Sequence, residues 1–189
     1  MTGINEINIV SGLPRSGTSL MMQMLECGGM AIVTDNVRAA DVDNPRGYYE
    51  LESVKKIRED TSWLPSARGK AFKMVSQLLY DLPAIEKYRV VFMRRNLEEM
   101  LASQDAMLRR SGREPKPHHQ MTQAYTLHLR NLENWLGRQS NFRVLYVSYN
   151  DLVQHPESEA RRVSIFLDDQ PDVTGMVRAV DSTLYRNRT

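Results

Sequence analysis

Residues 8–25 combine the side chains and the backbone freedom that a phosphate-binding loop needs. Gly12 and Gly17 bracket a loop of Leu, Pro, Arg and Ser between a short apolar run and a Met-rich segment with helical spacing. Glycine lets the backbone turn and approach an anion closely, and the first N–H groups of the following helix point at such an anion. Arg15 adds a forked cation, and hydroxyl donors come from Ser16, Thr18 and Ser19. The stretch therefore predicts a strand, a phosphate cradle and a helix.

The same loop departs from the pattern that binds nucleoside triphosphates. That pattern is Gly, four residues, Gly, Lys and then Ser or Thr. Gly12 and Gly17 have this spacing and Ser19 holds the hydroxyl position, but Thr18 stands where the lysine belongs. Triphosphate chemistry uses that lysine on the β- and γ-phosphates and the hydroxyl on Mg²⁺. We therefore expect a nucleotide with a shorter phosphate chain.

A second cationic segment follows a second apolar strand. Residues 90–93 are apolar, and Arg94 and Arg95 come directly after them. Ligands of parallel α/β folds bind beyond the carboxyl ends of the strands, so Arg95 and the phosphate loop are expected at one rim. Ser103 follows eight residues after Arg95. Because helical side chains lean toward the N-terminus of their helix, this position favours a reach back toward the same rim.

The elements that must position these residues alternate between strand and helix patterns. Strand patterns cover residues 6–11, 70–75, 88–93 and 142–147, with a short one at 31–33. Helical patterns cover 17–27, 49–60, 119–138 and 171–181, and further helices begin after Asn96, in a capping box with Glu99, and at Pro156. This alternation predicts an α/β fold with a central, largely parallel sheet flanked by helices. A length of 189 residues makes one domain, 1–189, the expectation.

Composition narrows the class of protein. The net charge of +2 is too small to imply a nucleic-acid partner. No apolar run approaches the ~18 residues of a membrane span, and the N-terminus lacks the features of a signal peptide. The single cysteine, Cys27, excludes an internal disulfide framework and fits a cytoplasmic location. The adjacent His118 and His119 have no Cys or His partner at ligand spacing, so no metal is expected.

Three segments, in order, resemble the sulfotransferases that use 3′-phosphoadenosine 5′-phosphosulfate (PAPS). Residues 12–19, Gly-Leu-Pro-Arg-Ser-Gly-Thr-Ser, are similar to the 5′-phosphosulfate loop of that family. Residues 90–104 resemble its 3′-phosphate segment, and residues 144–156 resemble its segment of a strand, a tyrosine, an acidic residue, a leucine and a proline. The resemblance runs from about residue 8 to about residue 168. It implies a P-loop NTPase-like three-layer α/β fold.

The resemblance assigns the donor to two anion sites. It implies that the 5′-phosphosulfate lies on Pro14, Arg15, Ser16, Gly17, Thr18 and Ser19. It implies that the 3′-phosphate lies on Arg95 and Ser103, a pairing that their spacing alone does not establish. Tyr149 is implied to lie near the adenine. Typical members close a basic C-terminal segment over the 3′-phosphate, and the remaining candidate for that role is Arg186.

The reaction implied by the resemblance is sulfuryl transfer from PAPS to a hydroxyl or amine of a small molecule or peptide. Adenosine 3′,5′-bisphosphate leaves, and Arg15 and Lys73 are the implied stabilisers of its charge. The catalytic histidine of cytosolic relatives would stand two residues after Lys73, where this chain has Val75. Relatives that act on protein tyrosines use a carboxylate after the first helix, and Asp35 is nearest to that place. Asp35 is therefore the predicted base, with further candidates at Asp41, Glu50, His118 and His119.

Two other functions fit parts of the sequence. A P-loop kinase acting on a small molecule would bind ATP with Mg²⁺, and Thr18 at the lysine position argues against it. A non-catalytic module would keep the nucleotide fold without turnover, as the short chain and the missing histidine allow. Segments 34–50 and 111–120 are expected to shape an acceptor pocket. The residues name neither the acceptor nor the oligomeric state.

Overall fold

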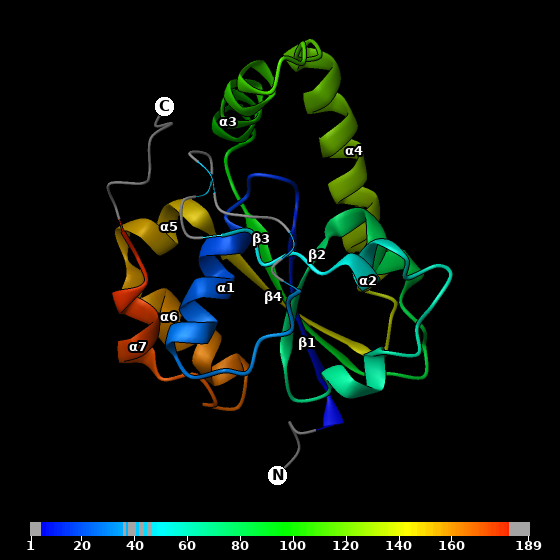
Figure 1. The fold of residues 1–189 in the computed structure, drawn as a ribbon, viewed down its shortest axis with the longest axis vertical. Coiled ribbons are helices and arrows are strands. Elements are labelled where there is room, and N and C mark those ends of the chain that lie inside the picture. Colours follow the sequence, from blue (N-terminus) through cyan, green and yellow to red (C-terminus); the bar gives the residue numbers. More distant parts are fainter. Residues whose placement is uncertain (1–4, 36, 38–40, 42–43, 45–46, 182–189) are drawn as a thin grey trace.

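Four parallel strands form the central layer of the computed structural model, which describes residues 5–35, 37, 41, 44 and 47–181 (Figure 1). The strands are β1 (Ile7–Gly12), β2 (Ala71–Val75), β3 (Tyr88–Arg94) and β4 (Phe142–Ser148), in the order β2-β1-β3-β4. In register, Val10 of β1 lies between Lys73 of β2 and Val91 of β3. The predicted parallel sheet is confirmed.

Helices cover both faces of this sheet. They are α1 (Thr18–Cys27), α2 (Glu52–Lys55), α3 (Leu97–Arg110), α4 (His118–Leu136), α5 (Tyr149–Gln154), α6 (Pro156–Phe166) and α7 (Val173–Arg178), with the 3₁₀ helices η2 (Leu64–Ala67) and η3 (Ser76–Asp81). Successive residues of a strand point to opposite faces. Val10 accordingly packs with α1 and α5–α7, whereas Ile9 packs with α2, η2 and α4. This three-layer arrangement confirms the predicted fold class. No helix in the described residues is long and apolar enough to cross a membrane.

Three elements differ from the sequence-based expectation. The strand expected at 31–33 is reduced to one bridge, between Ile32 and Ala71. The helix expected at 49–60 is reduced to α2, because Tyr49 has a left-handed backbone with φ of 53° and Leu51 is extended. Helix α5 follows β4 without a loop. Ser148 caps α5 by accepting a hydrogen bond from the N–H of Asp151, a signal that was present in the sequence.

The carboxyl ends of the strands meet at one edge, where the functional side chains gather. β1 leads into residues 13–17, β2 into η3, β3 into Arg95 and β4 into Tyr149. The Asn96 side chain caps α3 by accepting from the N–H groups of Glu98 and Glu99, at 2.9 and 3.3 Å. Beyond this edge α3 and α4 project away from the sheet (Figure 1).

Candidate active site

Two close approaches determine the shape of the phosphate loop. A Cβ atom at Gly12 would lie 2.5 Å from Ser16 Oγ and 2.6 Å from the Met93 carbonyl oxygen. A Cβ atom at Gly17 would lie 2.4 Å from Cδ2 of Tyr149, and φ of Gly17 is 98°. Both positions therefore need glycine. Helix α1 begins directly after Gly17, so the backbone N–H groups of its first turn face the space above the loop.

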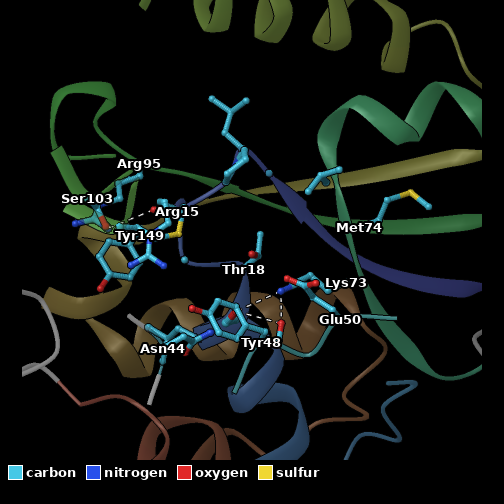
Figure 2. Close-up of a pocket in the computed structure, with 18 of the residues that line it drawn as sticks. Arg15, Thr18, Asn44, Tyr48, Glu50, Lys73, Met74, Arg95, Ser103 and Tyr149 are labelled. Atoms are coloured by element: carbon cyan, nitrogen blue, oxygen red, sulfur yellow. Dashed lines mark hydrogen bonds between the residues drawn. The ribbon is translucent and has the colours of Figure 1, made fainter. Parts of the chain in front are cut away.

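The side chains of Arg15 in the loop and of Arg95, directly after β3, converge with Ser103 of α3 beside this loop (Figure 2). Arg15 Nε donates to Ser103 Oγ at 3.1 Å, and Arg95 Nη1 donates to the Arg15 carbonyl oxygen at 3.3 Å. The Arg95 guanidinium also lies 4.5 Å from the centre of the Tyr149 ring. We call Arg15, Arg95, Ser103 and Tyr149 the arginine group.

A buried carboxylate orients the arginine group. Glu99 is 3% exposed, and its carboxylate accepts from Arg95 Nε at 3.3 Å and from Asn150 Nδ2 at 3.1 Å. The ion pair limits the rotamers of Arg95. Burial raises the pKa of the Tyr149 phenol, and the nearby Arg95 charge opposes that rise.

Lys73 and Ser19 meet on the opposite side of the loop. Lys73 Nζ donates to the main-chain oxygen of Tyr48 and lies 3.4 Å from Ser19 Oγ. Ser19 Oγ donates to the same Tyr48 oxygen at 3.3 Å. Glu50 follows two residues later, with its side chain 22% exposed and one oxygen 3.5 Å from Lys55 Nζ. A cation, a hydroxyl and a carboxylate therefore lie together next to the phosphate loop.

A single cavity of about 460 Å³ joins these two groups. The arginine group lies on one side of Figure 2, and Lys73, Glu50 and Met74 lie on the other, with Thr18 between them. Motifs that are far apart in the sequence are therefore combined in one site.

The comparisons identify the class of this site. A family model described as a sulfotransferase domain matches residues 7–187. The chain belongs to the sulfotransferase family. A comparison with curated protein sequences gives no significant match.

Solved sulfotransferase structures share the fold. The sulfotransferase domain from the Curacin biosynthetic pathway has 15% identity and a TM-score of 0.50, over 86% of this chain and 74% of that domain. The sulfotransferase from Alicyclobacillus acidocaldarius has 14% identity and a TM-score of 0.51, over 97% of each chain. At these identities the likeness supports the fold of this sulfotransferase, and the roles of its residues must come from its own geometry.

Most residues that the sequence assigned to the donor line the cavity. They are Pro14, Arg15, Gly17, Thr18, Ser19, Arg95, Ser103 and Tyr149, and Lys73 lines it as well. Ser16 is different: its hydroxyl is buried with no hydrogen-bond partner among the described residues, and its N–H donates to the Leu13 oxygen at 3.2 Å. The Ser16 hydroxyl packs against Gly12, where a Cβ atom would lie 2.5 Å from Ser16 Oγ. Arg186 lies outside the described residues.

Of the five residues considered as the base, Glu50 alone lines the cavity. The Asp35 carboxylate is exposed and accepts from the N–H groups of Val37 and Glu52, which lower its pKa. Asp41 accepts from the Tyr48 hydroxyl at 2.7 Å, and His118 Nε2 lies 2.7 Å from Asp105. His119 is exposed on α4.

Several lining or supporting residues were missed by sequence reasoning. Tyr48 and Arg110 line the cavity, and Glu99 and Asn150 support Arg95. Arg95 lies just before the Asn96 cap of α3 and Glu99 lies in its first turn, and this spacing of four residues was a readable signal for the ion pair. Within the described ranges, no three His, Cys, Asp or Glu side chains gather as ligands of a metal ion.

Proposed function

We propose that this sulfotransferase uses PAPS as its donor and transfers the sulfuryl group to a hydroxyl or amine acceptor. The observation that carries the proposal is the meeting of two anion-binding groups in one cavity. A nucleotide with phosphates at both the 5′ and 3′ positions needs two such groups. The Arg15 side chain donates to Ser103, and the Arg15 carbonyl oxygen accepts from Arg95, so Arg15 links the loop to the second group.

The donor is assigned end by end. The 5′-phosphosulfate lies over the N–H groups and hydroxyls of residues 17–19, with Arg15 beside it. The 3′-phosphate takes Arg95 and Ser103 as donors, and the adenosine lies near Tyr149. Because a phosphate accepts paired hydrogen bonds from guanidinium, an Arg95 held in place by Glu99 is well suited to this end.

Glu50 replaces Asp35 as the proposed base, since it faces the cavity and Asp35 does not. In the reaction, the acceptor oxygen forms a bond to sulfur while the Glu50 carboxylate takes the proton from the acceptor hydroxyl. The bond between sulfur and the bridging phosphate oxygen breaks, and its electrons stay on adenosine 3′,5′-bisphosphate. Lys73 and Arg15 stabilise that developing charge. Lys73 Nζ has three N–H donors and gives one to the Tyr48 carbonyl, so another can turn to the phosphosulfate.

Calorimetric titration of arginine variants with adenosine 3′,5′-bisphosphate tests the donor. Arg95→Ala should weaken binding about tenfold or more, because a hydrogen bond to a charged group contributes about 1.5–3 kcal/mol. The loss of affinity caused by Arg95→Ala should be smaller for adenosine 5′-monophosphate, which lacks the 3′-phosphate. Arg15→Ala should weaken both ligands.

Arg94→Ala is the matched control for the donor test. Arg94 is the preceding arginine, but it pairs with Glu133 at 2.5 Å, stacks on Tyr146 and does not line the cavity. Its substitution should leave bisphosphate affinity unchanged. Equal binding by the wild type and Arg95→Ala would contradict the donor assignment. Greater thermal stabilisation by ATP with Mg²⁺ than by the bisphosphate would favour the kinase alternative, and donor binding without transfer to any acceptor would favour the non-catalytic module.

A further inference from the structure

The half of the cavity around Lys73 and Glu50 has an apolar wall. Leu51, Val54, Met74 and Leu78 line it, and all four belong to one packed cluster on the α2 face of the sheet. Phosphate and sulfate groups prefer cations and N–H donors, whereas a wall of this kind is typical of sites for the body of an organic molecule. This half is therefore suited to the acceptor.

One face of α3 extends along the cavity from the arginine group toward solvent. Ser103, Met107 and Arg110 all line the cavity, and their spacing of four and three residues puts them on one face. At 1.5 Å per residue, Arg110 lies about 10 Å beyond Ser103 along the helix. Arg109, the neighbouring arginine, lies about 100° around the helix and does not line the cavity. This face of α3 therefore ends in a cation, Arg110.

Arg110 provides a charge beyond the two phosphate sites proposed above. The loop and Arg15 take one end of the donor, Arg95 and Ser103 take the other, and Arg110 lies two helical turns further out. An acid that binds next to a polyanionic donor is repelled unless it meets a cation of its own. Arginine binds carboxylates bidentately, which suits this role.

We propose that the acceptor is an amphipathic hydroxy acid. Its hydroxyl meets Glu50 and Lys73, its apolar body lies on the wall of Leu51, Val54, Met74 and Leu78, and its carboxylate pairs with Arg110. The proposal rests on the proposed sulfotransfer from PAPS. In that step the acceptor oxygen bonds to sulfur, its proton passes to Glu50, and the bisphosphate leaves with the electrons of the broken sulfur–oxygen bond.

The test compares acids with their own methyl esters. The probes are ω-hydroxy fatty acids of graded length and para-hydroxyphenylpropionate, each beside its methyl ester, with PAPS as donor. The wild type should favour at least one acid over its ester by about tenfold in kcat/KM, and that acid should bind the bisphosphate-loaded enzyme by calorimetry. Arg110→Ala should bring the ratio of acid to ester close to one. Arg110→Lys should retain part of the preference, and Arg109→Ala should retain all of it.

Three outcomes would overturn the acceptor class. The first is a wild type that binds the bisphosphate but neither binds nor turns over any acid of the panel. The second is an Arg110→Ala variant that lowers acid and ester turnover equally. The third is weaker bisphosphate binding in Arg110→Ala, which would assign this arginine to the donor. Failure of the wild type to bind bisphosphate at all would instead reject the proposed function.

Discussion

At the scale of single residues, the choice between Glu50 and Asp35 can be tested directly. Glu50→Gln removes the proposed proton acceptor but keeps the size of the side chain. We expect kcat to fall about 10²–10⁴-fold, the usual contribution of a general base, with bisphosphate affinity retained. The measurement is steady-state turnover at saturating donor, together with calorimetry of the bisphosphate.

Asp35→Asn is the control for this substitution. Asp35 is a carboxylate of the same loop region, but backbone N–H groups occupy it and it does not line the cavity. Turnover should stay near that of the wild type. A collapse of turnover in Asp35→Asn with normal turnover in Glu50→Gln would restore the base that the sequence predicted.

The arrangement of the phosphate loop was predictable because its residues are neighbours in the sequence. Gly12 to Ser19 are contiguous, so one strand, one loop and the start of one helix bring them into the same region. The base was not predictable in the same way. Glu50 enters the cavity because of contacts that residue types do not show: Tyr49 takes a left-handed conformation, and Thr34 Oγ1 donates to the Glu50 carbonyl at 2.9 Å. Residue types also did not show that the Ser16 hydroxyl turns inward.

At the scale of elements, the joint between β1 and α1 depends on the packing of Tyr149 against Gly17. In Gly17→Ala the new methyl group would meet the Tyr149 ring at 2.4 Å in a backbone with φ of 98°. Overpacking of this kind costs about 1–3 kcal/mol. We expect a lower free energy of unfolding in urea and weaker bisphosphate binding, because the loop must move away from α5.

A second glycine separates the clash from the backbone strain. Gly29 has a similar φ of 86°, but a Cβ atom there meets nothing within 4 Å. Gly29→Ala should therefore show only the cost of the left-handed backbone and keep its affinity for the bisphosphate. Adding Tyr149→Leu to Gly17→Ala should recover part of the lost stability. Equal losses of stability and of bisphosphate affinity in Gly17→Ala and Gly29→Ala would contradict the role of the contact between Gly17 and Tyr149.

The strands and long helices were predictable for a plain physical reason. A strand that is covered on both faces contains a continuous apolar run, as in residues 90–93, and a long amphipathic helix shows its period, as in residues 119–138. The short elements α2 and α5 lack both signals. Their bounds depend on the positive φ of Tyr49 and on the Ser148 cap, and α5 begins at Tyr149, two residues after the end of the strand pattern. Local backbone conformation and capping therefore set the bounds of these elements.

At the scale of the whole molecule, a buried arginine ties three parts of the chain together at the amino end of the sheet. Arg89 of β3 is 2% exposed; it pairs with Glu6 before β1 and with Asp168 after α6, and it donates to the Phe166 carbonyl at 3.1 Å. The nearby guanidinium lowers the pKa of Asp168. Removing one partner of a buried charge is costly because the other charge stays unpaired. Resistance of the fold to acid should therefore depend on this cluster.

The sign of the pH effect follows from the lowered pKa of Asp168. A carboxyl that is more acidic in the folded state adds stability above its unfolded pKa of about 3.9, and this stability is lost as the pH falls through the folded value. Asp168→Asn should lower Tm at neutral pH by up to roughly 2–4 °C, since a partly exposed ion pair contributes at most about 1 kcal/mol after solvent screening. The difference from the wild type should narrow below about pH 4. Asp169→Asn is the matched control, because φ is 57° at Asp169 and 58° at Asp168, and asparagine tolerates this conformation. Melting curves across this pH range would contradict the account if the Asp168→Asn difference were independent of pH, or if Asp169→Asn showed the same profile.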